Sequence, residues 1–524
     1  MPMRTRFVPE RCSLGRVVVA GCAALYALAC SPAQASDGLR VAAWNISNYA
    51  GGRAADIQTA VYAVFQDRQM APDAILLQEF LSQSAVDDFL QILNSAPGSP
   101  GDWAAAAFVN GPDTDSAFVY RTTRLDLLGV TTVAVGGASP NHPRNIMRYD
   151  VRPEGYTAPS TVIAMYSTHM KSGTTSDDQA RRLLEAQRIR DNAEVLDPAW
   201  NFLLGGDFNI QSSSQAAYQE LVGSQVNNAG RFFDPINTPG SWNNNGSYRF
   251  VHTQDPIGAG GMDDRHDQLL VCEDLIDGAG LDYIGNPALP YSITTWDDPN
   301  HSYRCWGNDG TSFNLALTTV GNTMVGEAIA IALRNVANGA GHLPVYLDLR
   351  VPAKVWTSTV QIDFGQVPQG STAEITLEVA NGGDVALWGA SGIETLQYTL
   401  DAEAPFFAPA GPHVDPAGPG TNQHVISMDT SAPGLFQTVL LLESNDPDVP
   451  VLVIDLTGEV LPDTPACPGD VDGDHDVDST DLNIILTAFG CSAPGPCSGD
   501  ADGDGDTDST DLNIVLTAFG QPCL

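Results

Sequence analysis

The chain has 524 residues, a length that predicts about three domains rather than a single core. Hydrophobic residues make up 43% of it and charged residues 17%, which excludes wholesale disorder, and the 50 Gly and 35 Pro favour a turn-rich globular protein. Because 63 acidic residues face only 24 Lys plus Arg, the net charge of −39 excludes a protein that coats nucleic acid with a basic surface.

The N-terminus, residues 1–35, is predicted to be a secretory signal peptide. Arginines precede an apolar stretch over residues 17–29, and Ala33-Gln34-Ala35 offers small residues for cleavage. A lipoprotein signal at Cys30 is the alternative, although Ala27 stands where such signals usually have Leu. Neither this run nor any later one approaches the roughly 20 apolar residues of a membrane-spanning helix. We therefore expect a secreted, extracellular protein without a transmembrane segment.

Six of the nine cysteines lie beyond this leader, and an even number in an oxidising compartment favours disulfides. Cys272 and Cys305 have only each other to pair with in their part of the chain, and two buried free thiols are the alternative. Three pairings are open to the four cysteines near the C-terminus, Cys467, Cys491, Cys497 and Cys523.

Residues 38–352 are predicted to form one domain in which strands and helices alternate. Short β-like runs bounded by polar residues or Gly predict strands over 39–46, 74–77, 117–120, 161–167 and 202–205. Apolar residues every three or four positions predict helices over 54–70 and 177–196. Mixed β and α with hairpin-like pairs favours an α+β fold with helices covering packed sheets.

Residues 355–461 are predicted to form an all-β sandwich. Runs over 372–379, 439–442 and 451–456 are separated by Gly, Pro and Asp turns, and none has helical spacing. The opening Ile362-Asp363-Phe364-Gly365 and the closing Leu456-Thr457-Gly458 resemble the immunoglobulin-like modules appended to many secreted bacterial enzymes. That resemblance implies an immunoglobulin-like sandwich and carries no chemistry.

Residues 469–490 and 499–520 form an internal repeat with a period of 30, identical at 18 of 22 aligned positions. Both copies place Asp at positions 1, 3, 5, 9 and 12 of a twelve-residue loop, the spacing that wraps oxygen ligands around Ca²⁺, with a backbone carbonyl at position 7. The predicted calcium ligands are Asp470, Asp472, Asp474, Asp476, Asp478 and Asp481 in the first copy and Asp500, Asp502, Asp504, Asp506, Asp508 and Asp511 in the second.

An apolar segment ending in Phe-Gly follows each loop, so residues 466–524 resemble the duplicated calcium loops of dockerin modules. The resemblance implies a small α domain and a cohesin-like receptor, with attachment to the cell surface as the alternative role. A solvated acidic tail is the competing structure, but it has no need of duplicated Leu, Ile and Phe. Position 6 is His475 in one copy and Gly505 in the other, and since glycine favours the left-handed turn, the first site is predicted to bind more weakly.

Six short motifs carry polar side chains, and the first two of them end predicted strands. A carboxylate there can hold a divalent cation that polarises a phosphoryl oxygen, and a His held by a carboxylate can act as a general base. Taken singly, each motif is more often structural. The motifs are Trp44-Asn45-Ile46, Leu76-Leu77-Gln78-Glu79, Ser167-Thr168-His169-Met170-Lys171, Gly205-Gly206-Asp207-Phe208-Asn209, Arg265-His266-Asp267 and Gly341-His342-Leu343-Pro344-Val345.

In this order and spacing the motifs resemble the endonuclease/exonuclease/phosphatase superfamily, which includes pancreatic deoxyribonuclease, apurinic endonucleases, bacterial sphingomyelinases and inositol polyphosphate 5-phosphatases. The match covers about residues 38–352. It implies a four-layer α/β/β/α sandwich with the site at one edge. Carried over, it makes Glu79 the main ligand of Mg²⁺ or Mn²⁺, places Asn45 beside it at the phosphate, and gives Asp207 and Asn209 the positioning of nucleophile and phosphate.

The same resemblance makes His342 the general base, oriented by Asp267, and lets His169 stabilise the oxygens of the transition state. Lys171 would contact the substrate, with a solvated surface lysine as the alternative. Members of the family usually read Ser-Asp-His-Leu-Pro-Val in the last motif, so Gly341 leaves one carboxylate missing here. Mg²⁺ keeps several waters and needs few carboxylates, so activity is still expected, and Gly341→Asp is predicted to strengthen metal binding.

The leading functional hypothesis is a secreted, metal-dependent phosphodiesterase, an endonuclease that hydrolyses nucleic acid. A phospholipase of the sphingomyelinase type shares every catalytic residue, but it needs an exposed apolar hairpin, and no apolar cluster surrounds the loop tryptophans Trp242 and Trp296. A non-catalytic adhesion or scaffold protein that kept the fold is the third hypothesis, and Gly341 is its main support.

Overall fold

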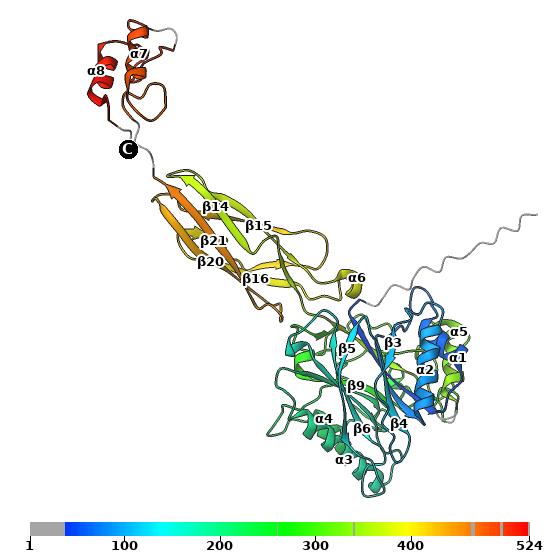
Figure 1. Cartoon of the computed structure of the whole chain (residues 1–524). Coiled ribbons are helices and arrows are strands. Elements are labelled where there is room, and N and C mark those ends of the chain that lie inside the picture. The colour runs from blue at the N-terminus through cyan, green and yellow to red at the C-terminus, as the bar shows by residue number, and fades with distance from the viewer. Residues whose placement is uncertain (1–36, 259, 339–340, 463–466, 493–495, 522–524) are drawn as a thin grey trace, which may run out of the picture. The chain divides into compact units, whose positions relative to one another are not determined.

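The computed structural model describes residues 37–258, 260–338, 341–462, 467–492 and 496–521, so the predicted signal peptide lies outside the described residues. Two β-sheets form the frame of the first part of the chain (Figure 1). The seven-stranded sheet has the order β10-β12-β1-β2-β4-β3, with β11 paired to β12. Its strands are β1 (Leu39–Tyr49), β2 (Ala74–Phe80), β3 (Trp103–Ala105), β4 (Asp115–Arg121), β10 (Asp282–Tyr283), β11 (Arg304–Cys305) and β12 (Val345–Arg350).

The second sheet has five strands in chain order, β5-β6-β7-β8-β9. Strand β8 runs parallel to β7 and antiparallel to β9, so the end of β7, the end of β8 and the start of β9 meet at one edge of the sheet. The strands are β5 (Leu125–Ala134), β6 (Ile146–Pro153), β7 (Ile163–His169), β8 (Asn201–Asp207) and β9 (Asp267–Val271).

Helices cover the outer face of each sheet (Figure 1). Successive side chains of a strand point to opposite faces, so β1 contributes to two cores. Val41 and Ala43 lie in the core shared with the second sheet, whereas Ala42 and Trp44 lie in the core beneath the helices. Helices α1 (Ala54–Tyr62), α2 (Gln83–Ser95) and α5 (Gly326–Ala337) cover the first sheet, and α3 (Ser176–Ala193) and α4 (Ala216–Val222) cover the second.

This arrangement confirms the predicted α+β sandwich, and all five predicted strands are present, each ending later than predicted, although the one predicted from residue 161 begins at Ile163. The helix predicted over 54–70 is too long, because α1 ends at Tyr62. Phe65 and Arg68 then pair across a tight turn whose two central residues, Gln66 and Asp67, have left-handed backbones. The apolar spacing continues through this turn, but the chain does not stay helical.

Residues 355–461 form two further sheets around a core of their own that includes Leu377, Leu440 and Ile454. One has the order β13-β15-β19-β17 and the other β14-β21-β20-β16-β18, with the short helix α6 (Val385–Trp388) between β15 and β16. The all-β sandwich is confirmed, and immunoglobulin-like kinship stays a prediction. The strands are β13 (Val355–Thr357), β14 (Gln361–Pro368), β15 (Glu374–Asn381), β16 (Leu396–Ala402), β17 (Phe406–Phe407), β18 (His413–Asp415), β19 (Asn422–Met428), β20 (Gly434–Ser444) and β21 (Val451–Leu461).

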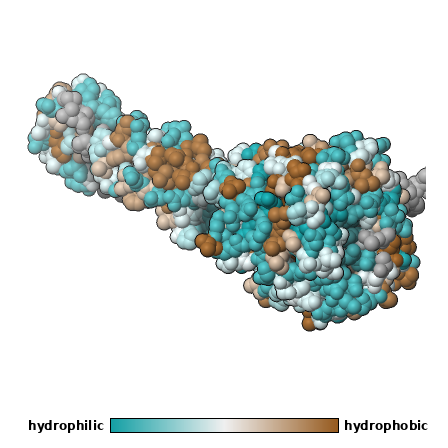
Figure 2. Space-filling view, turned by 90° about the horizontal axis from the view of Figure 1, so that it is seen from below, coloured by the Kyte–Doolittle hydropathy of each residue, from teal (hydrophilic) through white to brown (hydrophobic). Residues whose placement is uncertain are grey.

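Exposed apolar side chains are more concentrated on this sandwich than on the first part. Val425, Val451 and Val453 are each about half exposed on its strands. Figure 2 shows hydrophobic residues gathered on the sandwich, while on the large α+β part they are interspersed with hydrophilic ones. Trp242, expected in an exposed loop, is fully buried.

The two C-terminal repeats each consist of an acidic loop and one helix, α7 (Ser479–Ala488) or α8 (Ser509–Ala518). They contact each other reciprocally. Gly520, after the second helix, donates its N–H to Val477 in the first loop at 2.8 Å, and Gly490, after the first helix, donates to Thr507 in the second loop at 2.8 Å. Each loop is thus paired with the end of the other repeat's helix.

The disulfide expected between Cys272 and Cys305 does not form, because both thiols are free and buried. Cys272 follows β9 of the second sheet and Cys305 lies in β11 of the first, so the fold places them in different layers. A disulfide joins Cys491 to Cys497, and Cys467 is also disulfide-bonded. Cys523 lies outside the described residues.

Within the described ranges, no helix is both long and apolar enough to cross a membrane.

Candidate active site

Most of the predicted catalytic residues meet where the strands of the two sheets end. His169 ends β7 and lies opposite Asp207, which ends β8, and Asp207 in turn lies opposite Asp267, which begins β9. Asn45 and Glu79 reach the same place from the neighbouring parallel strands β1 and β2 of the first sheet. The sandwich therefore brings five chain segments, far apart in sequence, to one edge.

The Asn45 amide joins the two carboxylates at the centre of this cluster. Its Nδ2 donates to Glu79 Oε1 at 3.0 Å and to Asp207 Oδ2 at 3.2 Å, and its Oδ1 accepts from the Ser47 N–H at 3.0 Å. Asn45 is fully buried and Asp207 nearly so. Two carboxylates and an amide are the oxygen-rich side chains that suit Mg²⁺, so the residues fit the predicted cation.

A β-bulge in the pairing of β1 with β2 positions the Glu79 carboxylate in the site. The pairing of β1 with β2 shifts register between Asn45 and Tyr49. Ser47, Asn48 and Glu79 all have left-handed backbones, which L-residues adopt only when their surroundings hold them there. Glu79 Oε2 accepts the Asn48 N–H at 2.8 Å, so the bulge fixes the carboxylate beside Asn45.

Two histidines lie next to the same oxygen of Asp207. His169 Nε2 lies 3.3 Å and His342 Nε2 3.5 Å from Asp207 Oδ2. His342 Nδ1 is 2.6 Å from Asp267 Oδ2, and that oxygen also accepts the Thr253 hydroxyl at 2.6 Å. The carboxylate thereby fixes the orientation of the His342 ring, which leaves Nε2 facing the cluster.

The buried charges make the two histidines different. Burial lowers the pKa of His169 to about 3, so its ring is neutral near pH 7. Burial alone would also lower the pKa of His342, but the carboxylates of Asp267 and Asp207 raise it to about 10. Although burial opposes its ionisation, His342 and His169 together keep the pKa of Asp207 below its usual range. The cluster holds an ionised carboxylate between one neutral and one protonated imidazole.

Asn209 contacts the cluster through Asp207, whereas the Lys171 ammonium does not reach it. Asn209 has a left-handed backbone, donates its N–H to Asp207 Oδ1 at 3.0 Å and donates its Nδ2 to the Met170 carbonyl at 3.2 Å. The structure does not bring the Lys171 ammonium to the cluster, because Nζ pairs with Asp178 at 2.8 Å. Its role as a substrate contact stays a prediction.

The segment between Thr253 and His266 supplies residues that the motifs did not single out. Thr253 holds Asp267, as described above, and Asp255 donates its N–H to the Gly341 carbonyl at 3.0 Å. His266, one residue before Asp267, is 6% exposed and lies 6.4 Å from His342 between ring centroids. His266 lies within the motif Arg265-His266-Asp267, which could have indicated it, whereas no sequence pattern indicated Thr253.

Gly341 cannot take the carboxylate that Gly341→Asp was expected to restore. A Cβ at this position would lie 2.0 Å from the backbone oxygen of Ala337 and 2.5 Å from its carbonyl carbon. Gly341 therefore lies too close to the end of α5 for any side chain to fit at this position. The glycine is a packing requirement here, and the prediction that the substitution strengthens metal binding is wrong for this backbone.

The two C-terminal loops gather the predicted calcium ligands. In the first, ligand oxygens of Asp470, Asp472, Asp474 and Asp481 lie within 4.8 Å of one another, and in the second those of Asp500, Asp502 and Asp504 do so. Asp476, Asp478 and Asp481 form another such group, matched by Asp506, Asp508 and Asp511. Position 6 has a left-handed backbone in both copies, with φ 73° at His475 and 94° at Gly505.

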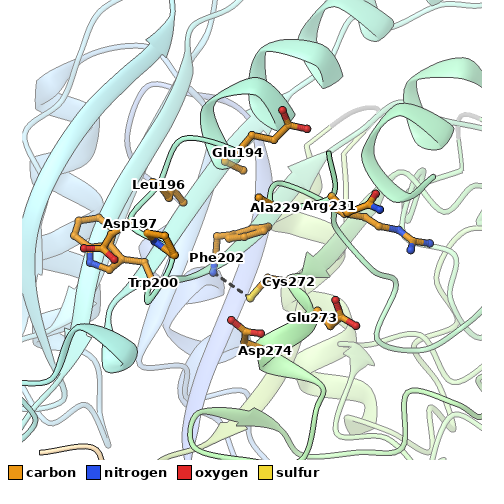
Figure 3. A pocket seen from close by; sticks show the side chains of 13 residues that line it. Glu194, Leu196, Asp197, Trp200, Phe202, Ala229, Arg231, Cys272, Glu273 and Asp274 are labelled. Carbon is orange, nitrogen blue, oxygen red and sulfur yellow. Dashed lines mark hydrogen bonds between the residues drawn. The ribbon is translucent and has the colours of Figure 1, made fainter. Parts of the chain in front are cut away.

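A separate pocket of about 230 Å³ lies at the start of β8, at the opposite end of that strand from Asp207 (Figure 3). Trp200 and Phe202 line it, and the Phe202 N–H donates to the Cys272 sulfur at 3.3 Å. Burial raises the pKa of the Cys272 thiol to about 12, so the sulfur is not a nucleophile at neutral pH.

No family model and no curated protein matches the chain. Similar solved structures include the human Nocturnin catalytic domain with bound sulfate, 14% identical over 60% of this chain and 95% of that one, with a TM-score of 0.35. D. rerio TDP2 complexed with single strand DNA product is 13% identical over 60% and 99%, with a TM-score of 0.33. An endonuclease/exonuclease/phosphatase from Beutenbergia cavernae is 14% identical over 80% and 100%, with a TM-score of 0.31. Structural similarity at this low level of identity carries no conclusion about activity.

Proposed function

We propose that the chain is an exported, Mg²⁺-dependent phosphodiesterase that cleaves nucleic acid internally. The observation that carries the proposal is the buried cluster in which Asn45 joins Glu79 and Asp207 while His342, held by Asp267, faces Asp207. Carboxylates of this kind hold a cation, and a histidine held by a carboxylate moves a proton, which together are what hydrolysis of a phosphodiester needs. The motif resemblance supports the same reaction.

Each residue has a part in this reaction. Glu79, with Asn45, would hold the cation, which when bound polarises a phosphoryl oxygen. Asp207 and Asn209 would position the attacking water and the phosphate, and His342 would take the water's proton at Nε2. The carboxylates of Asp267 and Asp207 raise the pKa of His342 to about 10, and the charge of a bound cation would lower it, so that Nε2 could accept the water's proton. Neutral His169 can donate to an oxygen of the transition state without adding charge.

Purified protein incubated with plasmid DNA, RNA and sphingomyelin vesicles, each with Mg²⁺ and with EDTA, tests the proposal. We expect nicked and linear plasmid in Mg²⁺ and none in EDTA. Release of phosphocholine with intact plasmid would replace the nuclease by a phospholipase. A folded protein that cleaves none of the three would favour the scaffold hypothesis.

We also propose that the C-terminal repeats bind Ca²⁺ and attach the enzyme to a cohesin-like receptor or to the cell surface. The grouped aspartate oxygens of both loops support the cation. Leu486, Phe489, Leu516 and Phe519 stand at matching positions of the two repeats, are each about half exposed and would provide apolar contact for a receptor. Calcium titration of the full chain, followed by calorimetry, tests the first step. Absence of binding heat would leave the repeats without this role.

A further inference from the structure

His266 is a buried histidine whose ring has no hydrogen-bond partner among the described residues. The residue is 6% exposed, and neither ring nitrogen makes a hydrogen bond to the described part of the chain. Its backbone is fixed, since its carbonyl accepts the N–H of Phe208 at 2.8 Å. Burying an unpaired polar group costs stability, so such a residue in a native fold calls for an explanation, and contact with a ligand is one.

Among the described residues, the buried histidines His169 and His252 each leave Nδ1 without a hydrogen bond, whereas His266 leaves both ring nitrogens without one. His301 is 3% exposed, and its two ring nitrogens lie 3.2 Å from the Tyr283 hydroxyl and 3.1 Å from the Leu289 carbonyl. His342 is held by Asp267. A histidine kept for packing alone would be expected to resemble His301, because unpaired ring nitrogens contribute nothing to a core.

The position of His266 points to the substrate. Its ring centroid lies 6.4 Å from that of His342, and its Nε2 lies 3.6 Å from Asp264 Oδ1, close enough for a charge interaction but not for a hydrogen bond. Asp264 is itself held by Asn243, whose Nδ2 donates to Oδ1 at 2.9 Å. A second histidine beside a fixed carboxylate thus stands next to the pair His342–Asp267.

We propose that His266 is a further catalytic residue, whose ring N–H donates a hydrogen bond to an oxygen of the phosphodiester undergoing hydrolysis. The proposal rests on the proposed function and extends it. His266 transfers no proton in this role. The bond between phosphorus and the leaving oxygen breaks, the bond from the attacking water to phosphorus forms, His342 takes the water's proton, and the leaving oxygen receives a proton from solvent, to which His342 returns the one it took. Asp264 favours the ring orientation in which the other nitrogen faces the substrate.

His266→Leu separates this role from a structural one, because leucine fills the space without buried polar atoms. We expect kcat on plasmid DNA to fall by about 10²-fold, the usual effect of losing one positioned donor, while the melting temperature stays equal or rises. His266→Gln, which keeps an N–H donor, should recover part of kcat. His301→Leu is the matched control, and it should lower the melting temperature with kcat nearly unchanged. A His266→Leu protein that is less stable and turns over normally would overturn the proposal.

A binding measurement keeps the test decisive if no activity is found. The melting temperature of each variant is measured in Mg²⁺ with and without inorganic phosphate, which offers the same oxygens as the substrate. Phosphate should stabilise the wild type and His301→Leu but stabilise His266→Leu much less. If the protein has no turnover but phosphate stabilises it only when His266 is present, the proposed function is wrong and the contact of His266 with phosphate is supported. Equal stabilisation of wild type and His266→Leu would reject the contact, whatever the activity.

Discussion

The side-chain amide of Asn45 lies between the carboxylates of Glu79 and Asp207 and bridges them by hydrogen bonds. Its single NH₂ group donates to both Glu79 and Asp207 in the buried centre of the site. This amide gives each carboxylate a hydrogen bond without placing a fixed positive side chain in the site. The negative charge of the cluster therefore remains available to bind a metal ion.

Asp207 and His342 are predicted to be indispensable. Asp207→Asn removes a charge shared by two histidines, and His342→Ala removes the proton acceptor held by Asp267. Either change should lower kcat by about two to four orders of magnitude, the usual contribution of a positioned acid or base. Steady-state kinetics with circular dichroism as a check on folding measures this effect. Asp178→Asn, in the ion pair with Lys171, is the control, and near-normal turnover of a folded Asp207→Asn protein would contradict the assignment.

Glu185 predicts a loss of stability in mild alkali. This carboxyl is fully buried on α3, accepts the Lys171 N–H at 3.0 Å, and burial raises its pKa from 4.5 to about 8. A pKa raised by folding means that the contribution of the protonated form is present below about pH 4.5 and is lost as the pH rises through about 8. Glu185→Gln should therefore unfold at higher urea than wild type at pH 8.5 and similarly at pH 4.5. Parallel pH profiles of the two proteins would show that Glu185 titrates normally.

At the scale of elements, the close approach of Gly341 to the end of α5 limits which side chains can stand beside His342. Gly341 passes so close to the Ala337 carbonyl that even a methyl group collides with the backbone. Gly341→Ala and Gly341→Asp should both destabilise the protein by at least about 1 to 3 kcal/mol, the usual cost of overpacking, and both should lower activity by moving His342. Gly137→Ala is the control, because the nearest atom to its missing Cβ is the side-chain amide nitrogen of Asn141 at 3.3 Å, which can move aside. Higher Mg²⁺ affinity in a stable Gly341→Asp protein would restore the expectation drawn from the family pattern.

The strands and their order at the site could be predicted from sequence, whereas the close approaches could not. Periodicity located β1, β2, β4, β7 and β8, and the strand-end motifs named the residues that meet there. The end of α1 was missed, because apolar spacing continues through the turn at Phe65. Thr253, the clash at Gly341 and the separation of Cys272 from Cys305 depend on how distant segments pack, which spacing along the chain does not contain.

At the scale of the whole molecule, the net charge of −39 opposes the approach of a polyanion. Salt screens such repulsion, since the Debye length shrinks from about 30 Å at 0.01 M to about 10 Å at 0.1 M. Raising NaCl through this range at fixed Mg²⁺ should therefore lower the KM for plasmid DNA, opposite to the behaviour of basic nucleases. A small phosphodiester such as bis(p-nitrophenyl) phosphate should show a much weaker effect. A KM for DNA that rises with salt would reveal a local basic site that outweighs the overall charge.

The reciprocal pairing of the two acidic repeats makes calcium occupancy a property of the pair. Since Val477 in the first loop is tied to Gly520 and Thr507 in the second to Gly490, ordering either loop also orders the end of the opposite helix. Asp500→Asn, which alters the second loop alone, should then weaken calcium uptake by the first as well, seen in calorimetry of the full chain as a loss of both binding heats. One undisturbed heat would show independent loops. Coupled in this way, the tail would respond over a narrow range of calcium concentration, as a threshold detector rather than a graded buffer.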